Sequence, residues 1–350
     1  MSGLSEIEKT TEGIKTKKKP DGFDKKFILV ILFTIIGFAA AIAANLLIPQ
    51  ISEDVKIEIY QVGPIYATMN NAYTWVLIAL IVLYLGIGIF SAFKKERRKK
   101  YRSRAPFRFA VGIALALWDL LGTKLQTLPQ PFFPGPAGII EAFLIEGDYI
   151  LQNTLYSLRL FSVGFLLGVV VGVGTGILIG WFPKVYYWVS PVLNITGVIP
   201  AVAWMPFALT LFPTPFSAAA FLIVICTWFP VASLTASGIK STPKAKFEAA
   251  RTLGGKTPYL VFHVAIPHAM PQIFTGIETA NAFSFTTLVM AEMMGQPGGL
   301  GYYINASKVW SAYYKVFAAI VVMAVLFSLI TWAVGLVKAR VLRWQRGLLK

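Results

Sequence analysis

The chain alternates between long apolar segments and short polar ones, and this pattern limits the folds open to it. Eight segments are apolar over about 20 residues, the length that a membrane-spanning helix requires. They lie at 27–48, 73–93, 109–125, 153–181, 186–212, 216–239, 272–293 and 314–337. Because lipid hydrocarbon offers no partners to backbone N–H and C=O groups, each segment must satisfy its own hydrogen bonds as a helix. The sequence therefore predicts an all-α polytopic membrane protein.

The basic residues predict how these segments are oriented. If both chain ends lie in the cytoplasm, the cytoplasmic segments hold 27 of the 32 Lys and Arg residues. These segments are 1–26, 94–108, 182–188, 240–263 and 338–350. Cytoplasmic loops of membrane proteins carry such an excess of Lys and Arg. The net charge of +16 is thus explained without a nucleic-acid partner, and the termini are predicted to be N-in and C-in.

The same reading gives a domain organisation. The first apolar segment is longer than the hydrophobic region of a signal peptide, which favours an uncleaved anchor. The basic run 94–100, which is expected to touch anionic membrane lipids, separates a two-span hairpin from six further spans. The predicted parts are a basic cytoplasmic tail (1–26), a two-span hairpin with its linker (27–108), a transmembrane domain (109–340) with a cytoplasmic loop (240–271), and a C-terminal tail (341–350).

Small residues and prolines mark the middle of the chain. Glycines recur every four residues at Gly164, Gly168, Gly172, Gly176 and Gly180. On a helix this spacing makes one flat stripe, which predicts the close approach of another helix. The next two segments contain Pro191, Pro200, Pro206 and Pro230. Prolines within spans indicate either kinked packing or a transport pathway, and the sequence leaves both open.

The stretch Gly255-Lys256-Thr257 resembles the end of a phosphate-binding loop, but its context excludes one. That loop requires a glycine at position 250 and a preceding buried strand, whereas the chain has Ala250 in a loop between two spans. The single cysteine, Cys226, and the two histidines form no metal-binding pattern. We therefore predict no catalytic residues, no metal and no cofactor.

The same stretch predicts a short surface helix. Pro243 suits a first helical turn, good helix formers follow from 244 to 253, and Gly254-Gly255 is a typical helix stop. Phe247, Ala250 and Leu253 or Gly254 are predicted to share one face, which gives a small and shallow knob. An exposed amphipathic helix of this kind indicates docking to a soluble partner or, alternatively, contact with lipid.

Three motifs resemble those of a known family. The first is Glu248-Ala249-Ala250, then Gly254, then Val264 to Pro267, which is similar to the coupling loop of type I ABC importer permeases. The other two are Val289 to Gly295 followed by Gly299-Leu300-Gly301-Tyr302, and Leu128-Pro129 to Pro134-Gly135-Pro136. These resemble the nitrate, sulfonate, taurine and bicarbonate class of such permeases. The resemblance covers residues 109–340.

This resemblance implies a permease core of six transmembrane helices, here preceded by a two-helix hairpin, in the inner membrane of a prokaryote. Two such subunits would form the pore, two ABC ATPase subunits would hydrolyse ATP, and an extracytoplasmic binding protein would deliver the solute. The residues implied to couple to the ATPase are Glu248, Ala249, Ala250, Arg251, Gly254 and Gly255. One departure is Glu278, where the family usually has a basic residue, and it argues against a simple anionic substrate.

Polar residues within spans are candidates for the translocation pathway, because they are costly in lipid and usually face a cavity or the bundle interior. They are Asn194, Thr196, Glu278, Asn281, Ser284, Thr287 and Glu292. Several of these candidates also have an alternative interpretation. Glu278 would lie near the cytoplasmic interface, and Glu292 would form a structural ion pair, for which Arg159 is a possible partner. The Ser and Thr hydroxyl groups would only join helices.

The function implied is that of a permease for a small polar solute: nitrate-, sulfonate-, taurine- or bicarbonate-like, or a vitamin precursor. The alternatives are a secondary transporter and a structural membrane subunit, neither with an ATPase partner.

Overall fold

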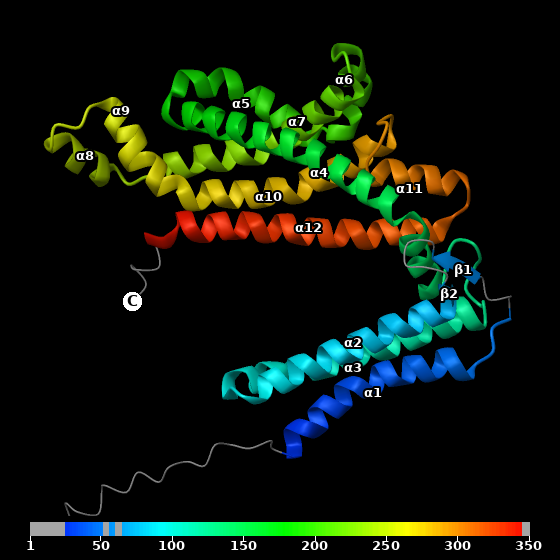
Figure 1. Cartoon of the computed structure of the whole chain (residues 1–350). Coiled ribbons are helices and arrows are strands. Elements are labelled where there is room, and N and C mark those ends of the chain that lie inside the picture. Colours follow the sequence, from blue (N-terminus) through cyan, green and yellow to red (C-terminus); the bar gives the residue numbers. More distant parts are fainter. Residues whose placement is uncertain (1–24, 52–55, 60–64, 345–350) are drawn as a thin grey trace, which may run out of the picture. The chain divides into compact units, whose positions relative to one another are not determined.

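The computed structural model describes residues 25–51, 56–59 and 65–344. Nearly all of this backbone is helical (Figure 1). The long helices are α1 (Lys25–Leu47), α2 (Met69–Ala92), α3 (Lys95–Asp119), α4 (Pro136–Trp181), α5 (Pro183–Val198), α7 (Pro215–Lys240), α10 (Ile266–Met293) and α12 (Tyr313–Val341). The shorter ones are η2 (Leu120–Lys124), η3 (Ala201–Trp204), α6 (Met205–Leu211), α8 (Lys244–Thr252), α9 (Thr257–Tyr259), η4 (Leu260–Ala265) and α11 (Leu300–Val309).

One short pair of strands departs from the all-α prediction. Strands β1 (Lys56–Ile59) and β2 (Ile65–Thr68) pair antiparallel, with Lys56 opposite Thr68. They join α1 to α2, and Thr68 caps α2 by accepting a hydrogen bond from the Asn71 N–H group. The predicted tails over 1–26 and 341–350 fall largely outside the described residues.

The chain divides into two compact units, Met1–Glu141 and Ala142–Lys350. In the first unit, α1 and α3 touch through glycines: a Cβ atom on Gly112 would lie 2.5 Å from the carbonyl carbon of Gly37. This contact places the third apolar segment, 109–125, with the first two, whereas the sequence grouped it with the spans that follow. The assignment of 109–340 to one transport domain stays a prediction.

The second unit is organised by the glycine stripe of α4. Each glycine faces a residue of α7 that also recurs every four positions: Ile223, Thr227, Val231, Thr235 and Ile239. A Cβ atom on Gly168 would lie only 2.5 Å from the Thr227 Cβ atom. The predicted close approach of a second helix is therefore confirmed, and its partner is α7. The residue numbers of the contacting pairs rise together along both helices, from Gly164 with Ile223 to Gly180 with Ile239. Helices α4 and α7 therefore run in the same direction.

Two neighbouring parallel helices require that the chain return between them. The returning segment is α5 together with η3 and α6, which bend by 105° at a break next to Pro200. Seven described helices are long and apolar enough to span a membrane, and this bent pair makes an eighth if it crosses once. We infer a single crossing, since α7 begins again at the end where residues 142–181 of α4 began. The eight predicted segments thus all fall on helices.

Helix α10 packs antiparallel on α7, and α12 packs antiparallel on α10 (Figure 1). The first pairing is fixed by Gly238 against Ala269 at one end and Gln296 bonded to Pro215 at the other. As a result the C-terminal ends of α4, α7 and α12 and the N-terminal end of α10 lie together. Helix α8 is presented at this end of the unit.

Candidate functional site

Helix α8 has the boundaries that the sequence predicts. It begins after Pro243, and Gly254 stops it with a φ of +82°, a conformation that favours glycine. The N–H groups of Gly254 and Gly255 donate to the carbonyl oxygens of Arg251 and Ala250, both at 2.9 Å. A Cβ atom on Gly255 would lie 2.7 Å from the Ala250 carbonyl oxygen. Both glycines are therefore required by the tight turn after the helix.

The exposed face of α8 differs in part from the predicted one. Glu248, Ala249 and Arg251 are exposed, Ala250 is half-buried, and Leu253 is 89% exposed. Phe247, which the sequence assigns to the same face as Ala250, is half-buried like Ala250, so this face of α8 is not its exposed one. Its ring packs inward, because an aromatic side chain finds a large apolar partner in the bundle below.

Three contacts join α8 and its loop to the helices that span the membrane. The Phe247 ring meets Trp181 at the end of α4 edge to face, with centroids 5.5 Å apart. The Lys246 Nζ atom lies 3.2 Å from His268 Nδ1 in the first turn of α10. The chain then passes through η4 directly into α10. Helix α8 is thus in contact with both α4 and α10.

A cavity of about 620 Å³ lies where the fifth span breaks. The described residues that line it come from the break itself, from α7 and from α10: Thr196, Gly197, Ile199, Pro200, Ala201, Val202, Ile225, Cys226, Phe229, Pro230, Phe283, Thr286, Thr287 and Met290. Cys226 and Phe283 lie near the middle of their helices. Broken helices that line a cavity at this depth are typical of solute sites in transporters.

The polar candidates divide between this cavity and the bundle interior. Thr196 and Thr287 line the cavity. Ser284 is buried and lies 2.7 Å from the Thr227 hydroxyl, which joins α10 to α7. Asn281 is buried and donates to the Thr331 hydroxyl of α12 at 3.0 Å. Asn194 is exposed on α5 and is not among the residues that line the cavity.

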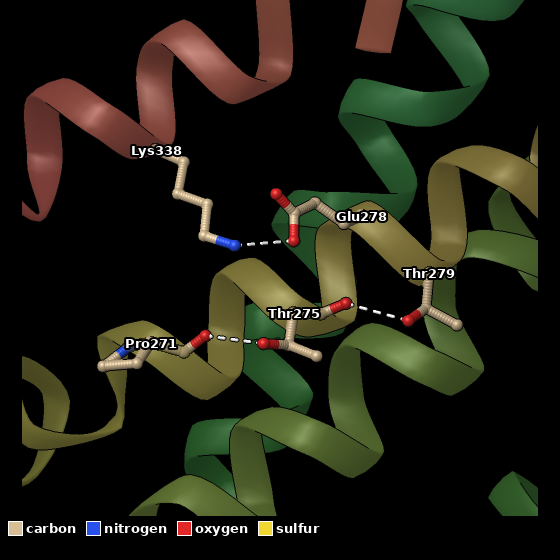
Figure 2. A network of polar contacts seen from close by, with 5 residues as sticks. All are labelled: Pro271, Thr275, Glu278, Thr279 and Lys338. Carbon is tan, nitrogen blue, oxygen red and sulfur yellow. Dashed lines mark hydrogen bonds and ion pairs between the residues drawn. The ribbon is translucent and has the colours of Figure 1, made fainter. Parts of the chain in front are cut away.

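Glu278 forms an ion pair with α12 (Figure 2). Its Oε2 atom accepts from the Lys338 Nζ atom at 2.7 Å, and the two side chains are 40% and 35% exposed. In the turns beside it, Thr279 and Thr275 each donate to a carbonyl oxygen four residues earlier in α10. Glu278 lies near the middle of α10 and Lys338 lies in the last turn of α12. Glu278 is not among the residues that line the cavity.

The Glu278–Lys338 pair is expected to contribute little to stability. Because both side chains are partly exposed, their mutual attraction is screened and offset by lost side-chain freedom. A double-mutant cycle of Glu278→Gln and Lys338→Gln should give a coupling free energy below about 1 kcal/mol. Thermal unfolding of the detergent-solubilised full chain measures it, and a coupling several times larger would contradict the screened geometry.

Glu292 lies in the last turn of α10 and forms part of the joint between α10 and the start of α11. There the first N–H groups of α11 donate to side chains: Gly299 to Asn153, Leu300 to Ser157 and Gly301 to Glu292, at 2.9, 2.8 and 2.8 Å. Unpaired N–H groups and a positive helix end favour such acceptors, a carboxylate above all. Glu292 is 1% exposed and lies outside the cavity lining.

Arg159, which the sequence offered as a partner for Glu292, lies instead over the Phe216 ring at 5.3 Å. Glu146, at the kink of α4, accepts a 2.7 Å hydrogen bond from the Tyr303 hydroxyl and pairs with Lys315. Burial, and then the Glu146 carboxylate, raise the pKa of Tyr303, so this phenol stays protonated as a donor. Among the described residues, no group of three or more His, Cys, Asp or Glu side chains is placed to hold a metal ion.

Sequence reasoning missed several residues that the structure brings into these sites. Asn153 and Ser157 lie four residues apart on α4, so their spacing marks a shared helical face, but nothing in it names α11 as the partner. Trp181 is a similar case, because its contact with Phe247 depends on how α4 and α8 meet.

The sequence matches one family of known proteins. The family of binding-protein-dependent transport system inner membrane components matches residues 164–343, which include α7, α8, α10 and the cavity. The chain belongs to this family and is a multi-pass transmembrane permease of the ABC transporter class.

The chain is also similar to curated permeases of several named transport systems. An aliphatic sulfonates transport permease protein, SsuC, of Bacillus subtilis is 30% identical over 73% of this chain and 92% of its own length. A bicarbonate transport system permease protein, CmpB, of Synechococcus elongatus is 29% identical over 74% and 94%. The taurine transport system permease protein TauC of Escherichia coli is 26% identical over 67% and 88%.

Among solved structures, an inward-facing MetNI methionine ABC transporter matches with a TM-score of 0.48 and 22% identity. The match covers 56% of this chain and 97% of that one.

Proposed function

We propose that this chain is the permease subunit of an ATP-driven importer and that it couples to a separate ATPase through α8. The observation that carries the proposal is a small-residue helix exposed at one end of the bundle and fastened to two spanning helices. Ala249 is exposed, whereas Phe247 and Lys246 fasten the helix to α4 and α10. A shallow knob of this kind fits into a groove on a soluble partner, and its attachment lets the partner move the bundle.

The proposed assembly has two copies of this chain, two ATPase subunits and an extracytoplasmic binding protein. It lies in the inner membrane of a prokaryote with both chain ends in the cytoplasm, because the basic segments then follow the positive-inside rule. ATP hydrolysis belongs to the partner subunits. The solute is small and polar: nitrate-, sulfonate-, taurine- or bicarbonate-like, or a vitamin precursor.

The mechanism follows from the contacts of α8. Closure of the ATPase pair would draw the two α8 helices together. Trp181 and His268 would carry this motion into α4 and α10, which both pack on α7. The break next to Pro200 offers the point at which the cavity opens to one side or the other, since a bent span reorients more easily than a continuous helix.

Replacing Ala249 by arginine tests the coupling. Because a bulky charged side chain cannot enter a groove shaped for a methyl group, we expect ATP-driven uptake to fall at least about tenfold, a loss of about 1.4 kcal/mol or more of binding. Ala249→Ser keeps the small size and should stay within about twofold of the parent. The measurements are solute uptake in cells and the ATPase activity that copurifies with the full-length chain.

Retention of both uptake and copurified ATPase by Ala249→Arg would show that α8 is not the docking element. The same purification separates the alternatives. A secondary transporter would take up solute in the absence of ATP hydrolysis, and a structural subunit would show no solute uptake.

A further inference from the structure

We infer that the cavity at the break takes a small solute that has an apolar body, donates hydrogen bonds and carries no negative charge. This inference rests on the proposed transport function, and it narrows the solutes proposed above to those without a net negative charge. It is carried by three features of the cavity: the charge of its lining, the direction of its hydrogen bonds and its aromatic walls.

The lining of the cavity is uncharged. None of the described residues that line it is an Asp, Glu, Lys, Arg or His. The two charged residues among the pathway candidates have partners elsewhere: Glu278 pairs with Lys338, and Glu292 accepts from Gly301. An anion that enters such a space loses its hydration and gains no opposite charge, which is strongly unfavourable in a low-dielectric interior.

The hydroxyl groups of the lining act as donors toward the protein. Thr196 donates to the Leu193 carbonyl oxygen at 2.9 Å, Thr286 donates to that of Ala282 at 3.3 Å, and Thr287 donates to the Cys226 sulfur at 3.2 Å. A hydroxyl group has one proton, so each of these oxygens is left with acceptor lone pairs. They can accept a hydrogen bond from a solute, but they have no proton to give to an anion oxygen.

Prolines add backbone acceptors to the same walls. Pro230 lies inside α7 and has no N–H group, so the Cys226 carbonyl oxygen lacks its usual helical donor. At the break, Pro200 likewise supplies no N–H group for the Thr196 carbonyl oxygen. Both Cys226 and Thr196 line the cavity. Amine, amide or hydroxyl groups of a solute are the natural partners of these oxygens.

Aromatic and aliphatic side chains supply the remaining surface. Phe229 lies against Gly197 so closely that a Cβ atom there would be 2.5 Å from the ring Cδ2 atom. Phe283 also lines the cavity and is 55% exposed. Flat apolar walls with a few acceptors favour a solute with a ring or a branched aliphatic body. An inorganic oxyanion would leave these walls without a partner.

The single cysteine allows a direct test, because Cys226 lines the cavity and every thiol modification on this chain, read by its intact mass, therefore comes from it. The full-length chain, purified with its ATPase, is treated with methyl methanethiosulfonate (neutral) and with its sulfonatoethyl analogue (anionic). Each rate is divided by that of the same reagent with 2-mercaptoethanol. We expect the normalised rate of the anionic reagent to be at least about tenfold lower, the effect of about 1.4 kcal/mol.

Thr286→Lys is the matched variant, because it places a cation in the cavity without touching Cys226. It should raise the normalised rate of the anionic reagent several-fold more than that of the neutral one, because a change in the thiolate fraction affects both reagents equally. Cys226→Ser should abolish labelling. Equal normalised rates for the two reagents in the parent chain, or no reaction with the neutral one, would overturn the inference.

Uptake separates failure of this inference from failure of the proposed function. Proteoliposomes that hold the complete transporter are tested with labelled nitrate, bicarbonate and ethanesulfonate. ATP-driven uptake of any of these anions would refute the inference and leave the coupling function intact. If no ATPase copurified with the chain but the labelling of Cys226 stayed charge-selective, the coupling would be refuted. The inference that the cavity disfavours anions would then still hold.

Discussion

Replacing Gly172 by leucine is expected to abolish the folded second unit. The site has no space: a Cβ atom on Gly172 would already lie 2.8 Å from the Val231 Cβ atom of α7. Helices within lipid associate mainly through close packing, since lipid tails are as apolar as the side chains they replace. Leucine would force α4 away from α7 along the whole stripe. Overpacking alone costs about 1–3 kcal/mol, and here it also removes the contacts of the neighbouring glycines.

Gly174→Leu is the matched control. It lies two residues further along the same helix, is exposed, and would find no atom within 4 Å of its Cβ atom. Size-exclusion chromatography of the detergent-solubilised chain measures both variants. Gly172→Leu should be aggregated or absent, and Gly174→Leu should elute like the parent. Equal monodispersity of the two variants would mean that the stripe does not set the distance between α4 and α7.

The stripe also shows what the sequence could predict. A spacing of four residues is a property of one helix, and so the flat face and the need for a close partner followed from α4 alone. The ends of α8 followed in the same way, because Pro243, Gly254 and Gly255 act on their own backbone. The identity of the partner did not follow, since Thr227 and Val231 carry no mark that assigns them to α4.

Features that depend on how helices meet were missed or misplaced for the same reason. Phe247 was assigned to an exposed face by its spacing, but the large apolar ring of Trp181 draws it inward. The contact of Gly37 with Gly112, which packs the third apolar segment against the first, also has no mark in the sequence. The motif from Val289 to Tyr302 resembled that of a family, but the joint that Glu292 forms with α11 depends on the three-dimensional structure.

Replacing Glu292 by alanine is expected to loosen this joint. The change would leave the buried Gly301 N–H group without its acceptor and would open a void beside Gly299 and Gly301, whose backbones press against the Glu292 side chain. The loss of a buried acceptor costs about 1–3 kcal/mol, and a charged acceptor costs more. The start of α11 would also lose the negative charge that its helix dipole favours. Thermal unfolding of the full chain in detergent should show a midpoint several degrees lower.

Two variants distinguish a joint from a pathway residue. Glu278→Ala removes a carboxylate from the same helix at a site that is 40% exposed, and it should lower the unfolding midpoint far less. Glu292→Gln keeps an oxygen that can accept from Gly301, so it should recover most of the stability and leave the KM for uptake unchanged. An altered KM at unchanged stability would instead place Glu292 in contact with the solute. Because its carboxylate is engaged by the backbone of α11, we expect the stability and not the KM to respond.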